Sequence, residues 1–226
     1  LASCNLPGRE SDMFNNFGYD KKTTDNMIGI ETGNKGSGNV NGEYLRYYTT
    51  ALAKGWRLAP LNNQDNHSLS TNSHRTVIIS NDLTQNSLFE ALRARRVYSS
   101  DDPNMEVIYK IGAHWMGEVV TVTAGSYTAI VKVQDDEPIT KLEIIDGNNN
   151  VVASQTFSNQ TTVEWNPVLQ VSANSYYFLK VYENDTNNDE PSYSEQITVT
   201  APIWLHVQWA HFLRDTIFKN HKIYLP

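Results

Sequence analysis

The chain has 226 residues, of which 39% are hydrophobic, with five Trp, twelve Tyr and seven Phe. This composition supports one large or two modest packed domains and indicates neither disorder nor a membrane span, since no apolar run approaches the roughly 20 residues that a bilayer requires. The formal net charge of -7 argues against a nucleic-acid partner, and the single cysteine, Cys4, excludes an intrachain disulfide.

The first part of the chain alternates turns with short regular elements. Residues 1–41 are polar and rich in Gly and Asn, and one strand is expected at 27–31. Apolar residues then recur at helical spacing over 44–52, with Gly55 where a C-terminal cap is expected. A strand over 56–61 leads into a polar loop.

A second set of elements follows this loop. The β-branched run 75–80 predicts a buried strand, and Asp82 or Thr84 can cap a helix that ends near Arg95. The order helix, strand, strand, helix, strand indicates an α/β architecture. We expect a first domain over residues 1–104, an α/β partial barrel.

After about residue 105 the hydrophobic period changes from 3.6 to 2. Short alternating strands are separated by turn signals, notably Asp146-Gly147-Asn148, which predicts a hairpin. Seven or eight such strands predict an all-β, immunoglobulin-like sandwich over residues 105–204. Residues 205–226 fit neither pattern and are treated as a tail, either a short helix or irregular chain.

The polar loop after the strand at 56–61 contains Asp65 and His67. In an extended backbone, residues two apart project to the same side, so a carboxylate and an imidazole would face one cation. These ligand types suit Zn²⁺, Mn²⁺ or Fe²⁺. The alternative is a hydrogen-bonded Asp/His turn, because this spacing is common in loops.

The run 54–67 resembles the last metal motif of the PHP (polymerase and histidinol phosphatase) superfamily, in its carbaryl-hydrolase-like branch. The segments 75–78 and 88–99 resemble the same branch, and the resemblance continues to 201–204. It implies a distorted β/α barrel with two or three metal ions at the carboxyl ends of its strands. It also implies Asp65 and His67 as metal ligands, and hydrolysis of a small ester or phosphoester by a metal-activated water.

Two departures from the family pattern bear on activity. The early family ligands, a His-x-His followed by a Glu and a His, would precede residue 1. The segment beginning at Asn5 resembles a family segment that reads Asn-His-Pro-Gly, and here Leu6 stands at the ligand position. Because Leu6 cannot bind a metal, we expect weak or no metal binding, and a chain that is inactive alone.

Four further residues are candidates for this site. Glu31 could face the metal pocket but is more simply an exposed or loop-capping carboxylate. His74 and His114 are expected to be surface or hydrogen-bonded residues. Arg75 is a candidate for an anion or substrate contact near the loop, and a structural salt bridge explains it equally well.

The sequence therefore leaves two functions open. The first is a fragment of a metal-dependent, phosphoesterase-type hydrolase, with Mn, Zn or Fe as the metal of the parent enzyme. The alternative is a non-catalytic binding or structural module dominated by the sandwich. We also expect no signal peptide within the chain, an extracellular or cell-surface location, and self-association through open sheet edges.

Overall fold

The computed structural model describes residues 1–34, 44–65, 73–188 and 194–208. Of these residues, 52% lie in strands and 12% in helices. The strands are β1 (Ala2–Cys4), β2 (Met27–Asn34), β3 (Ala59–Asn63), β4 (Arg75–Ile78), β5 (Val97–Ser100), β6 (Glu106–Ile111), β7 (His114–Trp115), β8 (Val119–Val122), β9 (Gly125–Asp146), β10 (Val151–Trp165), β11 (Val168–Val171), β12 (Ser175–Asn184), β13 (Glu195–Thr200) and β14 (Ile203–Val207). The helices are α1 (Met13–Phe17), α3 (Leu45–Ala53) and α4 (Gln85–Arg93).

A small parallel sheet is formed in the order β1-β2-β3. Helix α3 lies between β2 and β3 in the chain, so this region is a βαβ unit. The helix ends where the sequence predicts, since Gly55 has a φ of 99° and its N–H donates to the carbonyl of Leu52 at 2.9 Å.

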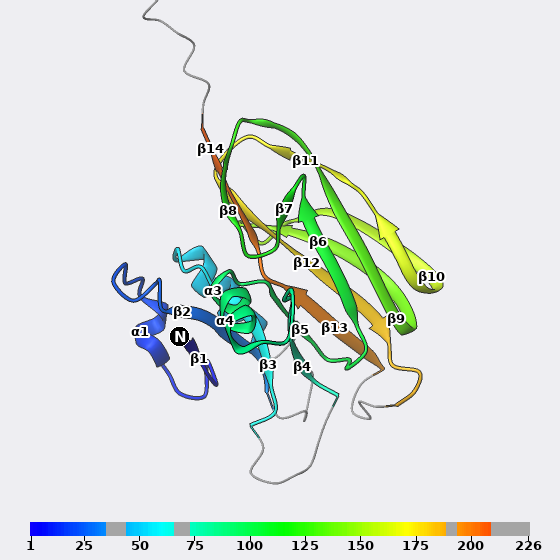
Figure 1. Ribbon diagram of the computed structural model, residues 1–226, viewed down its shortest axis with the longest axis horizontal. Coiled ribbons are helices and arrows are strands. Elements are labelled where there is room, and N and C mark those ends of the chain that lie inside the picture. The colour runs from blue at the N-terminus through cyan, green and yellow to red at the C-terminus, as the bar shows by residue number, and fades with distance from the viewer. Residues whose placement is uncertain (35–43, 66–72, 189–193, 209–226) are drawn as a thin grey trace, which may run out of the picture.

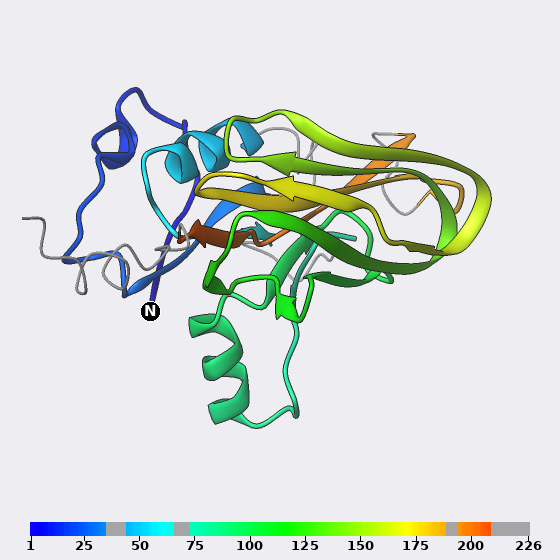
Figure 2. The same ribbon diagram turned by 90° about the horizontal axis from the view of Figure 1, so that it is seen from above.

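The second sheet has eleven strands, whose main path runs β4-β5-β13-β12-β9-β6-β7. Strands β10 and β11 pair with β9, and β14 pairs with β12 and β8. The sheet curls on itself, and β9 and β10 form a long hairpin at one end (Figures 1 and 2). A large apolar core lies inside this curl, and it includes Tyr109, Val131, Leu142 and Leu179.

A second core fixes the small sheet against the large one. Tyr48 of α3 is fully buried, its ring meets that of Phe178 on β12 at 5.8 Å, and its hydroxyl donates to the carbonyl of Thr200 at 3.3 Å. Ile30 of β2 and Trp204 of β14 belong to the same cluster. Helix α3 therefore connects the two sheets.

The expected fold class is wrong. An α/β partial barrel needs parallel strands alternating with helices, but that pattern ends at β3. Strands β4 and β5 pair antiparallel with each other, and β5 pairs antiparallel with β13, nearly a hundred residues later in the chain. The structure is mostly β, and a curled antiparallel half-barrel replaces the expected barrel and sandwich.

Several local expectations agree with the structure. Helix α4 begins after Thr84, whose hydroxyl accepts a hydrogen bond from the N–H of Ser87 at 3.3 Å. The β9–β10 hairpin turns at Asp146, whose carbonyl accepts from the N–H of Asn149 at 2.9 Å. The start of the stretch 205–226 differs from the expected helix or irregular tail, because Leu205 to Val207 lie in β14; residues 209–226 lie outside the described residues.

Among the helices of the described residues, none has the length and apolar character needed to cross a bilayer.

Candidate functional site

The carboxyl ends of β1, β2 and β3 meet at one edge of the small sheet, because all three strands are parallel. Leu6 follows β1, Glu31 lies in β2, and Asn63 ends β3. In parallel α/β units this edge is where ligand sites form. It is also the edge from which the loop with the predicted metal ligands leaves.

Glu31 is the centre of this edge. Its side chain is only 2% exposed, which differs from the exposed or capping carboxylate that the sequence favours. Its carboxylate accepts hydrogen bonds from the N–H of Leu6 at 2.5 Å, from Nδ2 of Asn63 at 2.8 Å and from Nδ2 of Asn34 at 3.1 Å. Neutral amide donors therefore satisfy the buried carboxylate.

Leu6 occupies this edge through its backbone. It adopts a φ of 49°, in the left-handed region that β-carbon sterics disfavour, and so aims its N–H at Glu31. Its apolar side chain supplies no metal ligand. At the position where the family segment has a histidine, this chain contributes a backbone donor to a carboxylate.

Of the predicted pair Asp65 and His67, the structure describes only Asp65. Asp65 is exposed and lies two residues beyond the end of β3, while His67 lies outside the described residues. Asp65 has a φ of 43°. This conformation is not the extended backbone on which the two-residue spacing argument depends.

The other candidate residues from the sequence make local polar contacts. Arg75 is half-buried at the start of β4, and its Nη1 donates to the carbonyl of His74 at 2.7 Å. His74 is 1% exposed. His114 lies in β7, and its Nδ1 is 3.2 Å from Oε2 of Glu118, as expected for a hydrogen-bonded histidine.

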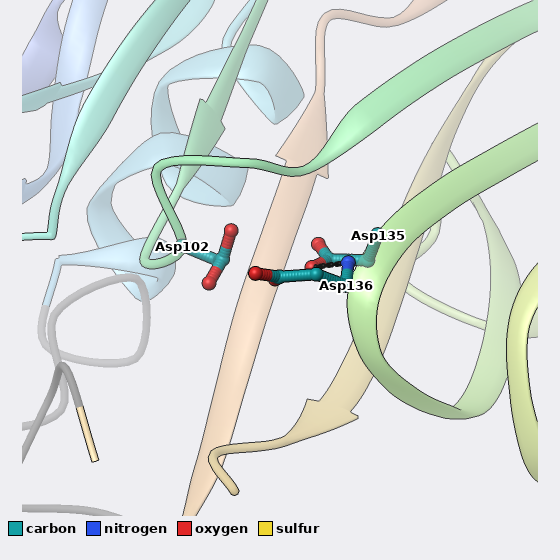
Figure 3. A group of neighbouring side chains, drawn as sticks. All are labelled: Asp102, Asp135 and Asp136. Carbon is teal, nitrogen blue, oxygen red and sulfur yellow. Dashed lines mark hydrogen bonds between the residues drawn. The ribbon is translucent and has the colours of Figure 1, made fainter. Parts of the chain in front are cut away.

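A second polar cluster, which the sequence interpretation missed, lies in the large sheet. Oxygen atoms of Asp102, Asp135 and Asp136 lie within 4.8 Å of one another. Asp102 follows β5, whereas Asp135 and Asp136 lie in the middle of β9 (Figure 3). Figure 3 shows the three carboxylates pointing toward the same small space. We call these three residues with Glu183 of β12 the acidic cluster.

Hydrogen bonds from nearby backbone N–H groups and from the side chain of Asn104 hold the three aspartates in place. Oδ1 of Asp102 accepts from the N–H of Asn104 at 2.5 Å and that of Met105 at 3.0 Å. Oδ1 of Asp135 accepts from the N–H of Asp136 at 2.6 Å, and Oδ2 of Asp136 accepts from Nδ2 of Asn104 at 3.1 Å. The cluster is therefore positioned by its own turns.

Glu183 completes the cluster from the neighbouring strand. It is fully buried, and neither of its carboxylate oxygens has a hydrogen-bond partner among the described residues. Burial raises its pKa, and the carboxylates of Asp135, Asp102 and Glu137 raise it further. Burial likewise raises the pKa of Asp135. The contact between Glu183 and Asp135 becomes a hydrogen bond only when one of the two carboxyl groups holds a proton.

Strand alternation was the signal for this cluster. Asp135 and Glu137 have the same parity in β9 as the buried residues Val131 and Val133, so they also point inward. Two carboxylates in a row at inward positions are unusual. Their approach to Asp102 depends on long-range pairing, which no local pattern shows.

No protein-family model matches the sequence, and the search of curated proteins found no match.

Proposed function

We propose that the chain derives from a metal-dependent hydrolase of the PHP type. We further propose that, at the carboxyl edge of the small sheet, hydrogen bonds now take the place of the metal site of such an enzyme. The observation that carries this proposal is the Glu31 carboxylate, which is enclosed by donors from Leu6, Asn34 and Asn63 at the carboxyl edge of a parallel sheet. The order of motifs around this edge supports the same origin. A helix ending at Gly55 leads to β3, and β3 leads to the loop with Asp65.

The residues that the structure describes at this edge, which do not include His67, do not fit a site with two or three metal ions. Such a site uses several carboxylate and imidazole ligands with free lone pairs. Amide donors bond both oxygens of Glu31, Leu6 has no ligand atom, and Asp65 offers one exposed carboxylate. We therefore propose that this chain alone does not hydrolyse the esters or phosphoesters of the parent enzyme.

The proposal is tested by restoring the ligand type at position 6. Leu6→His places an imidazole on the residue whose N–H contacts Glu31, and we expect the affinity of this variant for Zn²⁺ to rise at least several-fold over that of the unchanged chain. The double variant Leu6→His with Asp65→Ala should lose this gain. Isothermal titration with Zn²⁺ and Mn²⁺ measures both effects.

Two outcomes count against the proposal. An unchanged affinity in a folded Leu6→His variant means that position 6 is not a former ligand position. A gain that persists in the double variant means that the added imidazole acts without the predicted loop. Circular dichroism of each variant confirms that the fold is retained.

A second candidate function is a non-catalytic binding or structural module dominated by the strand-rich part of the chain. The acidic cluster favours it, because the buried Glu183 carboxylate, which has no hydrogen-bond partner among the described residues, points to a ligand rather than to a packed core. The metal titrations separate the two candidates, since the acidic cluster and the small-sheet edge have no residue in common.

A further inference from the structure

We propose that Asp102, Asp135 and Asp136, with the buried Glu183 beside Asp135, form a calcium-binding site that connects β5, β9 and β12. This inference goes beyond the proposed function, because none of the four residues lies at the edge of the small sheet. Each part of it follows from the position, burial and hydrogen bonding of the four carboxylates.

The spacing of the aspartate oxygens fits one calcium ion. Calcium binds oxygen ligands at about 2.3–2.6 Å, so ligands on opposite sides of the ion are about 5 Å apart. The three aspartate oxygens lie within 4.8 Å of one another. They come from two distant parts of the chain and point toward one space (Figure 3).

Glu183 supplies the independent observation that a cation is needed. Both of its oxygens are buried and receive no hydrogen bond from the described residues. Oδ2 of Asp135 and Oε2 of Glu137 are also buried and also receive no hydrogen bond from the described residues. A buried carboxylate is stable only when a cation, a donor or a proton compensates its charge. The charged neighbours that act on Glu183 are Asp135, Asp102 and Glu137, all of them carboxylates.

The ligand types select calcium among the common metals. The cluster offers only oxygen atoms, whereas zinc and the other transition metals favour imidazole and thiolate. Magnesium requires a near-ideal octahedron and retains several waters, which does not suit a largely buried set of carboxylates. Calcium accepts six to eight oxygens in irregular geometry. Asp136 is exposed, so it provides the side from which an ion enters.

The site would stabilise the place where the two sheets meet. Asp101, next to Asp102, accepts from Nδ2 of Asn62 on β3 at 3.0 Å and from the N–H of Ile197 on β13 at 3.1 Å. A calcium ion that holds Asp102 against β9 and β12 therefore also fixes a turn that contacts the small sheet. This predicts a structural role for the ion.

Thermal unfolding of the full chain tests the proposal. Millimolar calcium, added to protein stripped with chelator, should raise the Tm by several degrees, and magnesium at the same concentration should raise it less. Isothermal titration should show one calcium ion per chain. Glu183→Gln should abolish the Tm rise. Asp136→Asn, an exposed substitution that leaves the fold intact, should weaken calcium affinity several-fold.

The control is Glu164→Gln, which changes an exposed carboxylate on β10 outside the cluster and should leave the calcium response unchanged. Asp65→Ala should also leave it unchanged, which separates this site from the small-sheet edge. The proposal is overturned if calcium does not raise the Tm of the unchanged chain. It is also overturned if calcium raises the Tm of Glu183→Gln and of Asp136→Asn as much as that of the unchanged chain. It is also overturned if Glu183→Gln is more stable and calcium has no effect, because a shared proton then holds the cluster together.

Discussion

The backbone N–H of Leu6 donates to the carboxylate of Glu31 at 2.5 Å, across the carboxyl edge of the small parallel sheet. Leu6 stands at the position where the family that the sequence resembles has a histidine, and here it contributes a backbone donor. This contact gives the edge a structural role that can be measured.

Glu31→Gln should destabilise the fold. The new amide group would meet the donors of Leu6, Asn34 and Asn63 with its own N–H, so at least one buried donor loses its acceptor. We expect a loss of about 1–3 kcal/mol in the free energy of unfolding, measured by urea titration. Glu90→Gln, an exposed change on α4, is the control and should be nearly neutral. Equal stability of the two variants would show that the Glu31 contacts do not hold the edge.

Tyr48 should be a main point of attachment between the two sheets. Tyr48→Ala removes a fully buried ring that contacts Phe178, and a cost of about 3–5 kcal/mol is expected. Tyr48→Phe keeps the ring and removes only the hydrogen bond to Thr200, so it should cost about 0.5–1.5 kcal/mol. A small effect of Tyr48→Ala would mean that the sheets are stable without this helix contact.

Cys4 should react slowly with alkylating reagents. Burial raises the pKa of its thiol to about 11, so the reactive thiolate is scarce near neutral pH. In the folded protein the labelling rate should still rise between pH 9 and 10, where the unfolded chain in urea is approaching its plateau. Mass spectrometry of iodoacetamide labelling measures both rates. Rapid labelling of the folded chain near pH 8 would contradict the buried position of Cys4.

Asp82 should contribute stability that depends on pH. Hydrogen bonds from the side chain and backbone of Thr84 lower the pKa of Asp82 from 3.8. Because the folded-state pKa is the lower one, this contribution is present above pH 3.8 and is lost as the pH falls through the folded value. Asp82→Asn should therefore be less stable than the unchanged chain at neutral pH, and this difference should shrink as the pH falls below 3.8. A difference that does not change with pH would exclude the ionised carboxylate as its source.

Local elements could be predicted from the sequence, but their pairing could not. The helical spacing over 44–52 and Gly55 define α3, and alternation over 141–146 is found again in β9, because these signals depend on neighbours in the chain. The antiparallel pairing of β5 with β13 joins Ser100 to Thr198, and no local signal specifies such a distant partner. The predicted α/β fold was wrong because this distant antiparallel pairing was not predicted.

For the candidate sites, too, the local signals could be predicted from the sequence, but the contacts between distant parts of the chain could not. The Asp65 loop was predicted to bind a metal because Asp65 and His67 are two residues apart, and this interpretation stays a prediction. The strand was predicted to end at Glu31, but β2 continues to Asn34, and the burial of Glu31 depends on Leu6 and Asn63, which come from other parts of the small sheet. The acidic cluster needs β5, β9 and β12 together, so only the inward parity of Asp135 and Glu137 was visible beforehand.

The most direct test of the central claim is an assay of hydrolysis of nitrophenyl esters and phosphoesters with Mn²⁺ or Zn²⁺, comparing the unchanged chain with Asp65→Ala and His67→Ala. A closed, hydrogen-bonded edge predicts that all three proteins give the rate of the metal-containing buffer alone. A rate above that background in the unchanged chain, lost in both variants, would contradict the account and show a working metal centre in this loop.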